Sequence, residues 1–159
     1  MKMIIVDNSA ESRDRLLGLV AEVEGIHVVG MADDAATGML LAKAHRPNLA
    51  IVDLHLEGAE DNGGIDVIQS IKQARPASNV VALTRMQGVE HRADALAAGT
   101  DYVLDKSEEF DRLAGLLRML KNIHHRRTAP GAIAQAAPQK RKRSAGGPSS
   151  FLPVLRKNF

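Results

Sequence analysis

Five short apolar runs follow one another along the first 105 residues, and they constrain the fold more than any other feature of the sequence. They are rich in Val, Ile and Leu, and they occupy residues 3–7, 26–32, 48–53, 79–84 and 100–105. Runs that are continuously apolar, rather than alternating with polar residues, are typical of strands buried on both faces of a sheet. They therefore predict the strands of a parallel sheet.

A helix-like pattern follows each run. Between residues 9 and 23, Leu16, Val20 and Val23 recur at spacings of four and three residues and form one apolar face. Ser9 is a candidate N-cap for this helix. The remaining helices are predicted over residues 33–45, 65–74, 88–98 and 108–120.

Strand and helix thus alternate five times, which predicts an α/β fold with a parallel sheet and helices on both of its faces. Right-handed crossovers leave few topologies, and the natural one for five units is a doubly wound, flavodoxin-like sheet of order 2-1-3-4-5. Hydrophobic residues make up 45% of the chain and aromatic residues only 3%, so the core must be mainly aliphatic. We expect Met31, Met39 and Met119 to fill space within it.

Polar side chains stand where four of the predicted strands end. Asp7 and Asn8 close the first run, Asp53 closes the third, Thr84 closes the fourth, and Lys106 follows the fifth. In open α/β sheets, ligands bind beyond the carboxyl ends of strands, where the strand order reverses. We therefore expect Asp7 and Asp53, on neighbouring strands, to share one crevice flanked by Thr84 and Lys106.

Two neighbouring carboxylates repel each other unless a cation lies between them. Mg²⁺ suits such a place because it prefers oxygen ligands and commonly takes one or two carboxylates together with waters. A carboxylate can also attack phosphorus to give an aspartyl phosphate, and a metal and a lysine would then neutralise the phosphoryl oxygens. The strand ends consequently suggest phosphoryl chemistry.

Four separated stretches resemble the receiver domain of bacterial response regulators, in its stand-alone form. They are IIVDNSAESRDRL, NLAIVDLHLEG, VVALTRM and AGTDYVLDKSEEFDRL, and the resemblance covers residues 1 to about 121. It implies a phosphoacceptor that takes its phosphoryl group from a histidine kinase or a histidine phosphotransfer protein. The protein is then a signalling module and not a metabolic enzyme, with slow self-dephosphorylation at most.

The resemblance also implies a role for each polar residue at the strand ends. Asp53 is the phosphoryl acceptor, Thr84 is the switch hydroxyl, and Lys106 contacts the phosphoryl group. The implied Mg²⁺ ligands are Asp7, Asn8, Asp53 and the backbone carbonyl of His55.

The sequence departs from the family pattern in ways that bear on function. Asn8 replaces an acid of the metal site, which predicts weak Mg²⁺ binding and leaves a pseudo-receiver, an interaction domain with little or no phosphorylation, as the alternative. The switch aromatic usually lies three residues before the lysine, where this chain has Val103, with Tyr102 one residue earlier. Arg85 follows Thr84 where a small residue is typical. Arg85, Val103 and Tyr102 are therefore candidate modulators.

Charge divides the chain. Residues 1–111 hold 10 Lys and Arg against all 19 Asp and Glu, and residues 112–159 hold 11 Lys and Arg and no acid. We predict a receiver domain over residues 1–123 and a basic, largely disordered tail over 124–159. The tail has three interpretations: a solvated extension, a segment that docks on the acidic body or on a partner, and a weak nucleic-acid contact through residues 140–143.

Other features narrow the class of protein. The chain has no cysteine, which excludes disulfides and thiolate chemistry and fits a cytoplasmic protein. No secretory signal and no membrane-spanning stretch are visible. Output is expected through an unidentified partner protein, a homodimer, phosphate relay or the tail. A phosphatase with Asp53 as nucleophile and Asp7 as acid fits only loosely, because no D-x-D pair follows an apolar strand.

Overall fold

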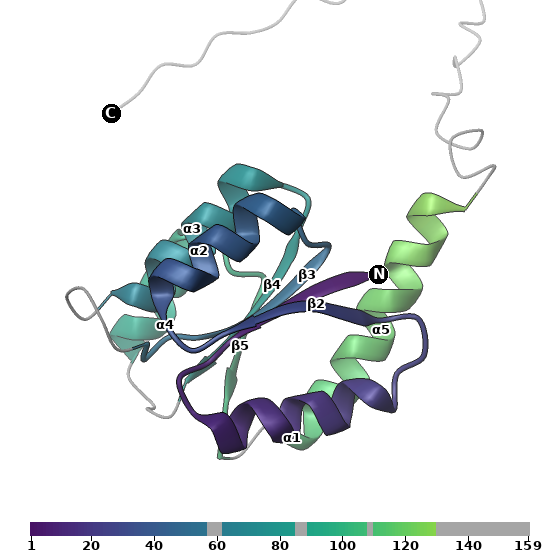
Figure 1. Ribbon diagram of the computed structural model, residues 1–159, viewed down its shortest axis with the longest axis horizontal. Coiled ribbons are helices and arrows are strands. Elements are labelled where there is room, and N and C mark those ends of the chain that lie inside the picture. Colours follow the sequence, from purple (N-terminus) through teal and green to yellow (C-terminus); the bar gives the residue numbers. More distant parts are fainter. Residues whose placement is uncertain (57–61, 85–88, 108–109, 130–159) are drawn as a thin grey trace, which may run out of the picture. The chain divides into compact units, whose positions relative to one another are not determined.

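The computed structural model describes residues 1–56, 62–84, 89–107 and 110–129, except for the side chains of residues 89–91 and 110. Residues Met1–Ala129 form one compact unit. Its elements alternate between strand and helix from end to end (Figure 1). The strands are β1 (Lys2–Val6), β2 (His27–Ala32), β3 (Leu49–Asp53), β4 (Asn79–Thr84) and β5 (Tyr102–Asp105). The helices are α1 (Ala10–Ala21), α2 (Ala35–His45), α3 (Gly63–Ala74), α4 (Val89–Ala97) and α5 (Phe110–Thr128).

The five strands form one parallel sheet in the order β2-β1-β3-β4-β5. The predicted fold class and strand order are therefore confirmed. The register matters for function: Val6 of β1 pairs with Val52 of β3, so Asp7 and Asp53 leave the sheet side by side. Thr84 pairs with Asp105, which brings the ends of β4 and β5 to the same edge.

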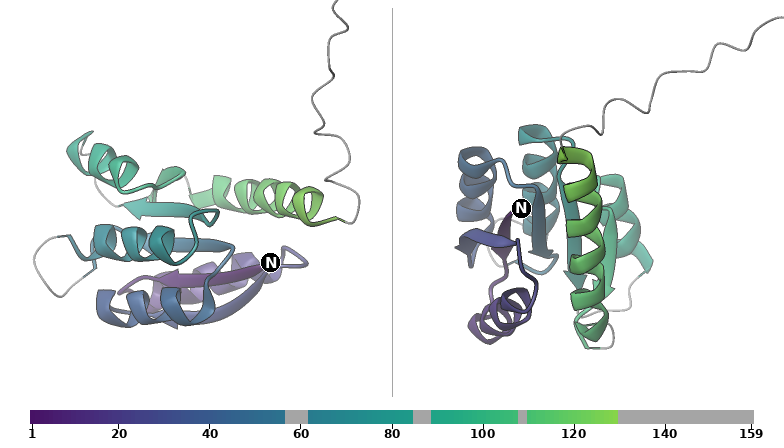
Figure 2. Two further views of the ribbon diagram at one scale, coloured as in Figure 1. Left: turned by 90° about the horizontal axis from the view of Figure 1, so that it is seen from above. Right: turned by 90° about the vertical axis from the view of Figure 1, so that its right-hand side faces the viewer.

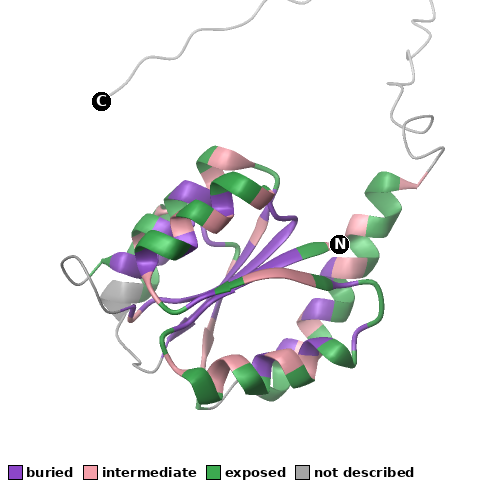
Figure 3. Cartoon of the chain, in the orientation of Figure 1, coloured by how far each residue is buried: buried purple, intermediate pink, exposed green. Residues whose placement is uncertain are grey.

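Helices cover both faces of the sheet. Helices α1 and α5 lie on one face, and α2, α3 and α4 lie on the other (Figure 2). Each face has its own apolar cluster, and Leu16, Leu113 and Leu117 are central to the one beneath α1 and α5. The strands β1, β3 and β4 are buried almost throughout, as continuous apolar runs predict (Figure 3).

Local hydrogen bonds explain several helix ends. The Ser9 side chain accepts a hydrogen bond from the backbone N–H of Ser12 at 3.3 Å, so Ser9 is the N-cap of α1 as predicted. Helix α5 continues to Thr128, eight residues past the expected end at Leu120. The Thr128 hydroxyl donates to the carbonyl of His124 at 3.0 Å and thereby satisfies a carbonyl in the last turn.

The prediction for two methionines was wrong. Met31 is 44% exposed and Met119 is 42% exposed, whereas Met39 is partly buried against the core. Met31 lies on the edge strand β2, and Met119 lies on the outer side of α5, because Leu117 and Leu120 take the inward positions. Among the described residues, no helix combines the length and apolar character needed to cross a membrane.

Candidate functional site

Asp7 is fully buried where β1 passes into α1, and its carboxylate is held from two sides. One oxygen, Oδ1, accepts the backbone N–H of Ser9 at 2.9 Å, and the other, Oδ2, accepts the Ser12 hydroxyl at 2.6 Å. Arg13 donates from its guanidinium to the Asp7 backbone carbonyl at 2.6 Å. The first turn of α1 thus fixes both the main chain and the side chain of Asp7.

Asp53 is the last residue of β3 and is 2% exposed. Its Oδ1 accepts the backbone N–H of His55 at 3.0 Å. The residue after Asp53 is still paired with the sheet, because the backbone N–H of Leu54 donates to the carbonyl of Leu83 on β4 at 2.9 Å. The carboxylate is therefore oriented by its own loop, with Oδ2 turned towards the strand-end crevice.

Lys106 joins the two acids. Its ammonium nitrogen lies 2.7 Å from Oδ2 of Asp7 and 2.6 Å from Oδ2 of Asp53. The lysine side chain is only 8% exposed, and the two carboxylate side chains are 0% and 2% exposed. A single buried cation consequently bridges two buried carboxylates at the carboxyl edge of the sheet, where the strand order reverses between β1 and β3.

Asn8 lies next to this bridge but does not contact the lysine in any described hydrogen bond. Its side-chain NH₂ group donates to the backbone carbonyl of His55 at 3.2 Å. That contact links the loop after β1 to the loop after β3. It also occupies the carbonyl oxygen that the family resemblance assigns to the metal.

Thr84 ends β4 and is 8% exposed. Its backbone carbonyl accepts the N–H of Lys106 at 2.7 Å, so the threonine and the lysine are tied together through the main chain. The structure thus brings Asp7, Asp53, Thr84 and Lys106 to one edge. Arg85, a predicted modulator, lies outside the described residues.

The other two predicted modulators face opposite ways. Val103 is buried and belongs to the apolar cluster beneath α2, α3 and α4, whereas Tyr102 is half-buried and packs with the cluster beneath α1 and α5. Successive residues of a strand point to opposite faces of a sheet. Tyr102 therefore does not occupy the place of the family's switch aromatic, which Val103 takes.

Two residues of the site were not predicted from the sequence. One is Ser12, whose hydroxyl donates to Asp7 Oδ2 at 2.6 Å. The other is Gly64, which approaches the end of β3 so closely that a Cβ built there would lie 2.5 Å from the Asp53 carbonyl oxygen and 2.6 Å from the Leu54 Cα. The Gly-Gly pair that begins α3 was the available signal for such a close approach.

The donor set of this edge fits a hard divalent cation. Asp7 and Asp53 present carboxylate oxygens close enough to share one cation, as the position of Lys106 demonstrates, and the His55 carbonyl is an oxygen donor beside them. Mg²⁺ favours such ligands together with waters. Within the described residues, no three His, Asp or Glu side chains gather as a metal-binding group, so an ion here would depend on carbonyl oxygens and water. Asn8 would have to turn its amide to contribute its oxygen.

Comparison with known families gives a match over most of the compact unit. Residues 3–118 match the response regulator receiver domain. The photosynthetic apparatus regulatory protein RegA of Rhodovulum sulfidophilum is 34% identical over 116 residues, which cover 72% of this chain and 61% of that protein. A protein-glutamate methylesterase/protein-glutamine glutaminase of Myxococcus xanthus is 29% identical, and the match covers 99% of this chain and 49% of the relative. The chain thus spans about half the length of such curated relatives.

Solved structures agree on the fold. The crystal structure of a two-component response regulator of the LuxR family from Aurantimonas sp. SI85-9A1 is similar with a TM-score of 0.67 at 26% identity, covering 76% of this chain and 84% of that one. A CheY-like receiver domain protein from Methanospirillum hungatei JF-1 has a TM-score of 0.65 at 22% identity, covering 77% of this chain and 95% of that one. The latter likeness concerns the fold alone.

Proposed function

The chain belongs to the response regulator receiver family, and we propose that it accepts a phosphoryl group on the carboxylate of Asp53 and signals through protein–protein contacts. The observation that carries the proposal is the buried Lys106 ammonium, 2.6 Å from Asp53 and 2.7 Å from Asp7. A cation so placed can stabilise negative charge that arrives on Asp53. Phosphoryl transfer asks for little more than positioning and charge neutralisation of this kind.

In the proposed reaction, an Asp53 oxygen attacks phosphorus and the bond from phosphorus to the donor histidine nitrogen breaks. The donor is a histidine kinase or a histidine phosphotransfer protein, whose imidazole leaves with the bonding electrons. Lys106 then contacts a phosphoryl oxygen, and the Thr84 hydroxyl, at the end of the neighbouring strand, serves as the switch contact. The backbone N–H of His55 keeps Asp53 in its orientation.

Mg²⁺ fits this proposal as a weakly bound cofactor. When bound, it would supply additional positive charge for the phosphoryl oxygens. Asp7, Asp53 and the His55 carbonyl would hold it, and Asn8 would contribute only its amide oxygen, with one negative charge fewer than an acid. We therefore expect Asn8→Asp to bind Mg²⁺ more tightly than wild type in a calorimetric titration. Equal affinities would contradict the role given to Asn8.

A pseudo-receiver is the second candidate function, and one contact favours it. The Asn8 amide donates to the His55 carbonyl while the Lys106 ammonium already pairs with both acids, so the site is held together by its own groups. Such a site would favour a stable interaction domain over a phosphorylation switch. The two functions differ in one measurable property, which is whether Asp53 becomes modified.

Incubation with acetyl phosphate and Mg²⁺, followed by intact-mass spectrometry, separates the two functions. The phosphoacceptor gains about 80 Da for the added phosphoryl group, and Asp53→Asn loses that gain. Asp33→Asn is the matched control, because Asp33 is an exposed aspartate that follows β2 at the same edge of the sheet. No mass gain in wild type would favour the pseudo-receiver. A gain retained by Asp53→Asn would show that another residue accepts the group.

The proposal extends to organisation and partners. Residues 1–123 would act as the receiver and residues 124–159 as a basic tail, and the phosphorylated form would bind an output protein or a second copy of itself. Transfer from a kinase requires a shared compartment, which we propose is the cytoplasm. A pull-down with phosphorylated and Asp53→Asn protein, each with and without the tail, tests which part recruits the partner.

A further inference from the structure

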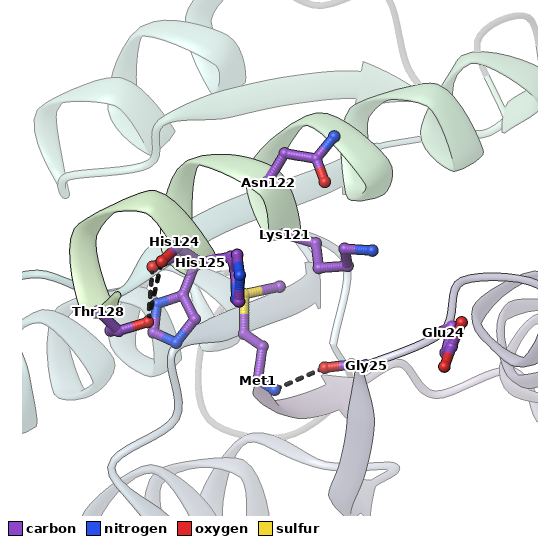
Figure 4. Close-up of a pocket in the computed structure, with 8 residues that line it drawn as sticks. All are labelled: Met1, Glu24, Gly25, Lys121, Asn122, His124, His125 and Thr128. Carbon is purple, nitrogen blue, oxygen red and sulfur yellow. Dashed lines mark hydrogen bonds between the residues drawn. The ribbon is translucent and has the colours of Figure 1, made fainter. Parts of the chain in front are cut away.

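A second site lies at the opposite end of the sheet from Asp53. A cavity of about 480 Å³ opens between the last turns of α5, the start of β1 and the turn that follows α1 (Figure 4). Met1 lines it and Asp7 closes the other end of the same strand, so the cavity and the phosphoacceptor edge are separated by the length of β1. Nothing in the proposed phosphotransfer uses this region.

The walls of the cavity are fixed by main-chain contacts. The Met1 amino group donates to the Gly25 carbonyl at 2.6 Å, and the Met1 carbonyl accepts the His27 N–H at 2.9 Å. The Lys121 side chain lies over the turn, since a Cβ built on Gly25 would stand 3.7 Å from the lysine Cδ. Gly25 has a φ of 85°, which favours glycine at this position.

Basic groups outnumber acidic groups in the lining of the cavity. Lys121, His124 and His125 come from α5, and Glu24 is the acid among the lining residues. Figure 4 shows the two histidines and the lysine along one stretch of helix, facing the Met1 and Gly25 wall. Positive charge thus exceeds negative charge around the cavity. Its volume also suits a small ligand, because pockets for small molecules commonly measure about 300–1,000 Å³.

His124 lies in an environment that disfavours its charged form. Burial, followed by nearby positive charges, lowers the pKa of His124 below its ordinary value of 6.5. The carboxyl end of a helix would by itself raise the pKa of a histidine. Burial and the neighbouring cations act in the opposite direction and lower the pKa of His124.

We propose that this cavity binds a small phosphate-bearing anion. Ammonium and imidazolium N–H groups make charge-assisted hydrogen bonds to phosphate oxygens. An anion placed between Lys121 and His124 would offset the repulsion among the cations and favour the charged form of His124. The inference does not depend on phosphorylation of Asp53, because the two sites share no residue.

Affinity for the anion should rise as the pH falls. In the free protein His124 is neutral near pH 7, and a bound anion would raise its pKa, so binding takes up a proton in the range around and below 6.5. Among the described residues, the charged and titratable groups around His124 are Lys121, His125 and Arg127 on α5, Arg75 at the end of α3, Glu24 after α1 and the Met1 amino group.

The test is a titration of the full chain with pyrophosphate, followed by backbone amide NMR shifts. Mg²⁺ is left out and ionic strength is held constant, at pH about 6 and about 8, on either side of the ordinary histidine pKa. We expect saturable, one-site shifts at the amides of Lys121 and His124, no shift at Lys106, and tighter binding at the lower pH. Sulfate serves as the comparison anion and should bind more weakly.

Two variants and a control locate the site. Lys121→Gln and His124→Gln should each weaken binding about tenfold or more, as expected for loss of a charge-assisted hydrogen bond. Arg118→Gln removes an exposed cation from the same helix, 3.9 Å from Glu22 and outside the cavity, and should leave affinity unchanged. Shifts that never saturate, shifts confined to Lys106 or to residues 140–143, or equal weakening by Arg118→Gln would each overturn the proposal.

Discussion

Removal of the Lys106 ammonium should destabilise the fold strongly. The variant Lys106→Met keeps most of the length of the side chain and its apolar character but removes the charge. In the wild-type protein the Lys106 ammonium lies 2.7 Å from the Asp7 carboxylate and 2.6 Å from the Asp53 carboxylate, and all three side chains are at most 8% exposed. The substitution therefore leaves two buried carboxylates facing each other without a cation.

The size of the effect follows from burial. Removing one partner of a buried ion pair costs about 3–5 kcal/mol of unfolding free energy, whereas an exposed pair contributes about 1 kcal/mol or less. The Lys106 pairs belong to the buried class. A cation at high concentration should restore part of the loss, because a ligand that binds only the folded state stabilises it by about 2.7 kcal/mol at roughly a hundredfold excess over its Kd.

Urea unfolding followed by circular dichroism measures the change. Lys72→Met is the matched control, because its ammonium also makes two hydrogen bonds, to the Ser78 carbonyl at 2.6 Å and to Asp101 at 2.9 Å. Its side chain is 20% exposed and that of Asp101 is 38% exposed, so the loss should be much smaller, about 1 kcal/mol.

Two differences in unfolding free energy are expected if Lys106 forms a buried bridge. Lys106→Met must cost clearly more than Lys72→Met, and millimolar Mg²⁺ must stabilise Lys106→Met more than it stabilises wild type. If both lysine variants lose the same free energy, the buried bridge is no more important than a surface pair and the argument is refuted.

Three further predictions concern other parts of the fold. Gly64→Ala should lose about 1–3 kcal/mol and accept phosphate more slowly, because its Cβ would stand 2.5 Å from the Asp53 carbonyl oxygen; unfolding and mass-gain rates check this. Hydrogen bonds from the hydroxyl and backbone of Thr37 lower the pKa of Asp34, so its stabilising effect is present above the unfolded pKa of about 3.9 and is lost as the pH falls through the folded value. The difference in urea midpoint between Asp34→Ala and wild type should thus be full at neutral pH and shrink below about pH 4. Leu117→Ala, at a fully buried position, should cost about 2–5 kcal/mol, and an unchanged midpoint would count against the assigned core.

The fold was predictable because each level of the sequence points the same way. Apolar runs such as residues 48–53 contain no polar residue before Asp53 except the first, so a strand buried on both faces was the natural interpretation. The edge strand β2 was harder, since its residues are mostly exposed or half-buried although they read as apolar in sequence. Burial at an edge depends on neighbouring strands, which composition does not reveal.

The strand-end site was predictable for a topological reason. Once the strand order is known, residues that follow β1, β3, β4 and β5 must meet at one edge, and Asp7, Asp53 and Lys106 do so. The sequence could not predict which side chains and backbone groups of the site form hydrogen bonds with one another. The direction of the Asn8 amide depends on the position of the His55 carbonyl, a contact between residues 47 apart in the sequence.

The extent of α5 also escaped prediction. The segment after Leu120 is polar and contains neither Gly nor Pro before residue 130, so nothing in it stops a helix, but it lacks the apolar face that would announce one. Helix α5 nevertheless extends to Thr128, and its last turns line the cavity beside Met1 and Gly25. Short-range patterns underestimate helices of this kind.

The burial of Val103 limits the conformational changes by which the proposed phosphorylation could alter the surface of the protein. A branched aliphatic side chain has few rotamers and no flat ring that could swing from an inner to an outer position. In the proposed phosphorylation of Asp53, the response would then pass through the main chain, where the Lys106 N–H to Thr84 carbonyl hydrogen bond at 2.7 Å links the ends of β4 and β5. In this molecule a shift of the ends of β4 and β5, rather than the rotation of an aromatic side chain, would change the outer surface.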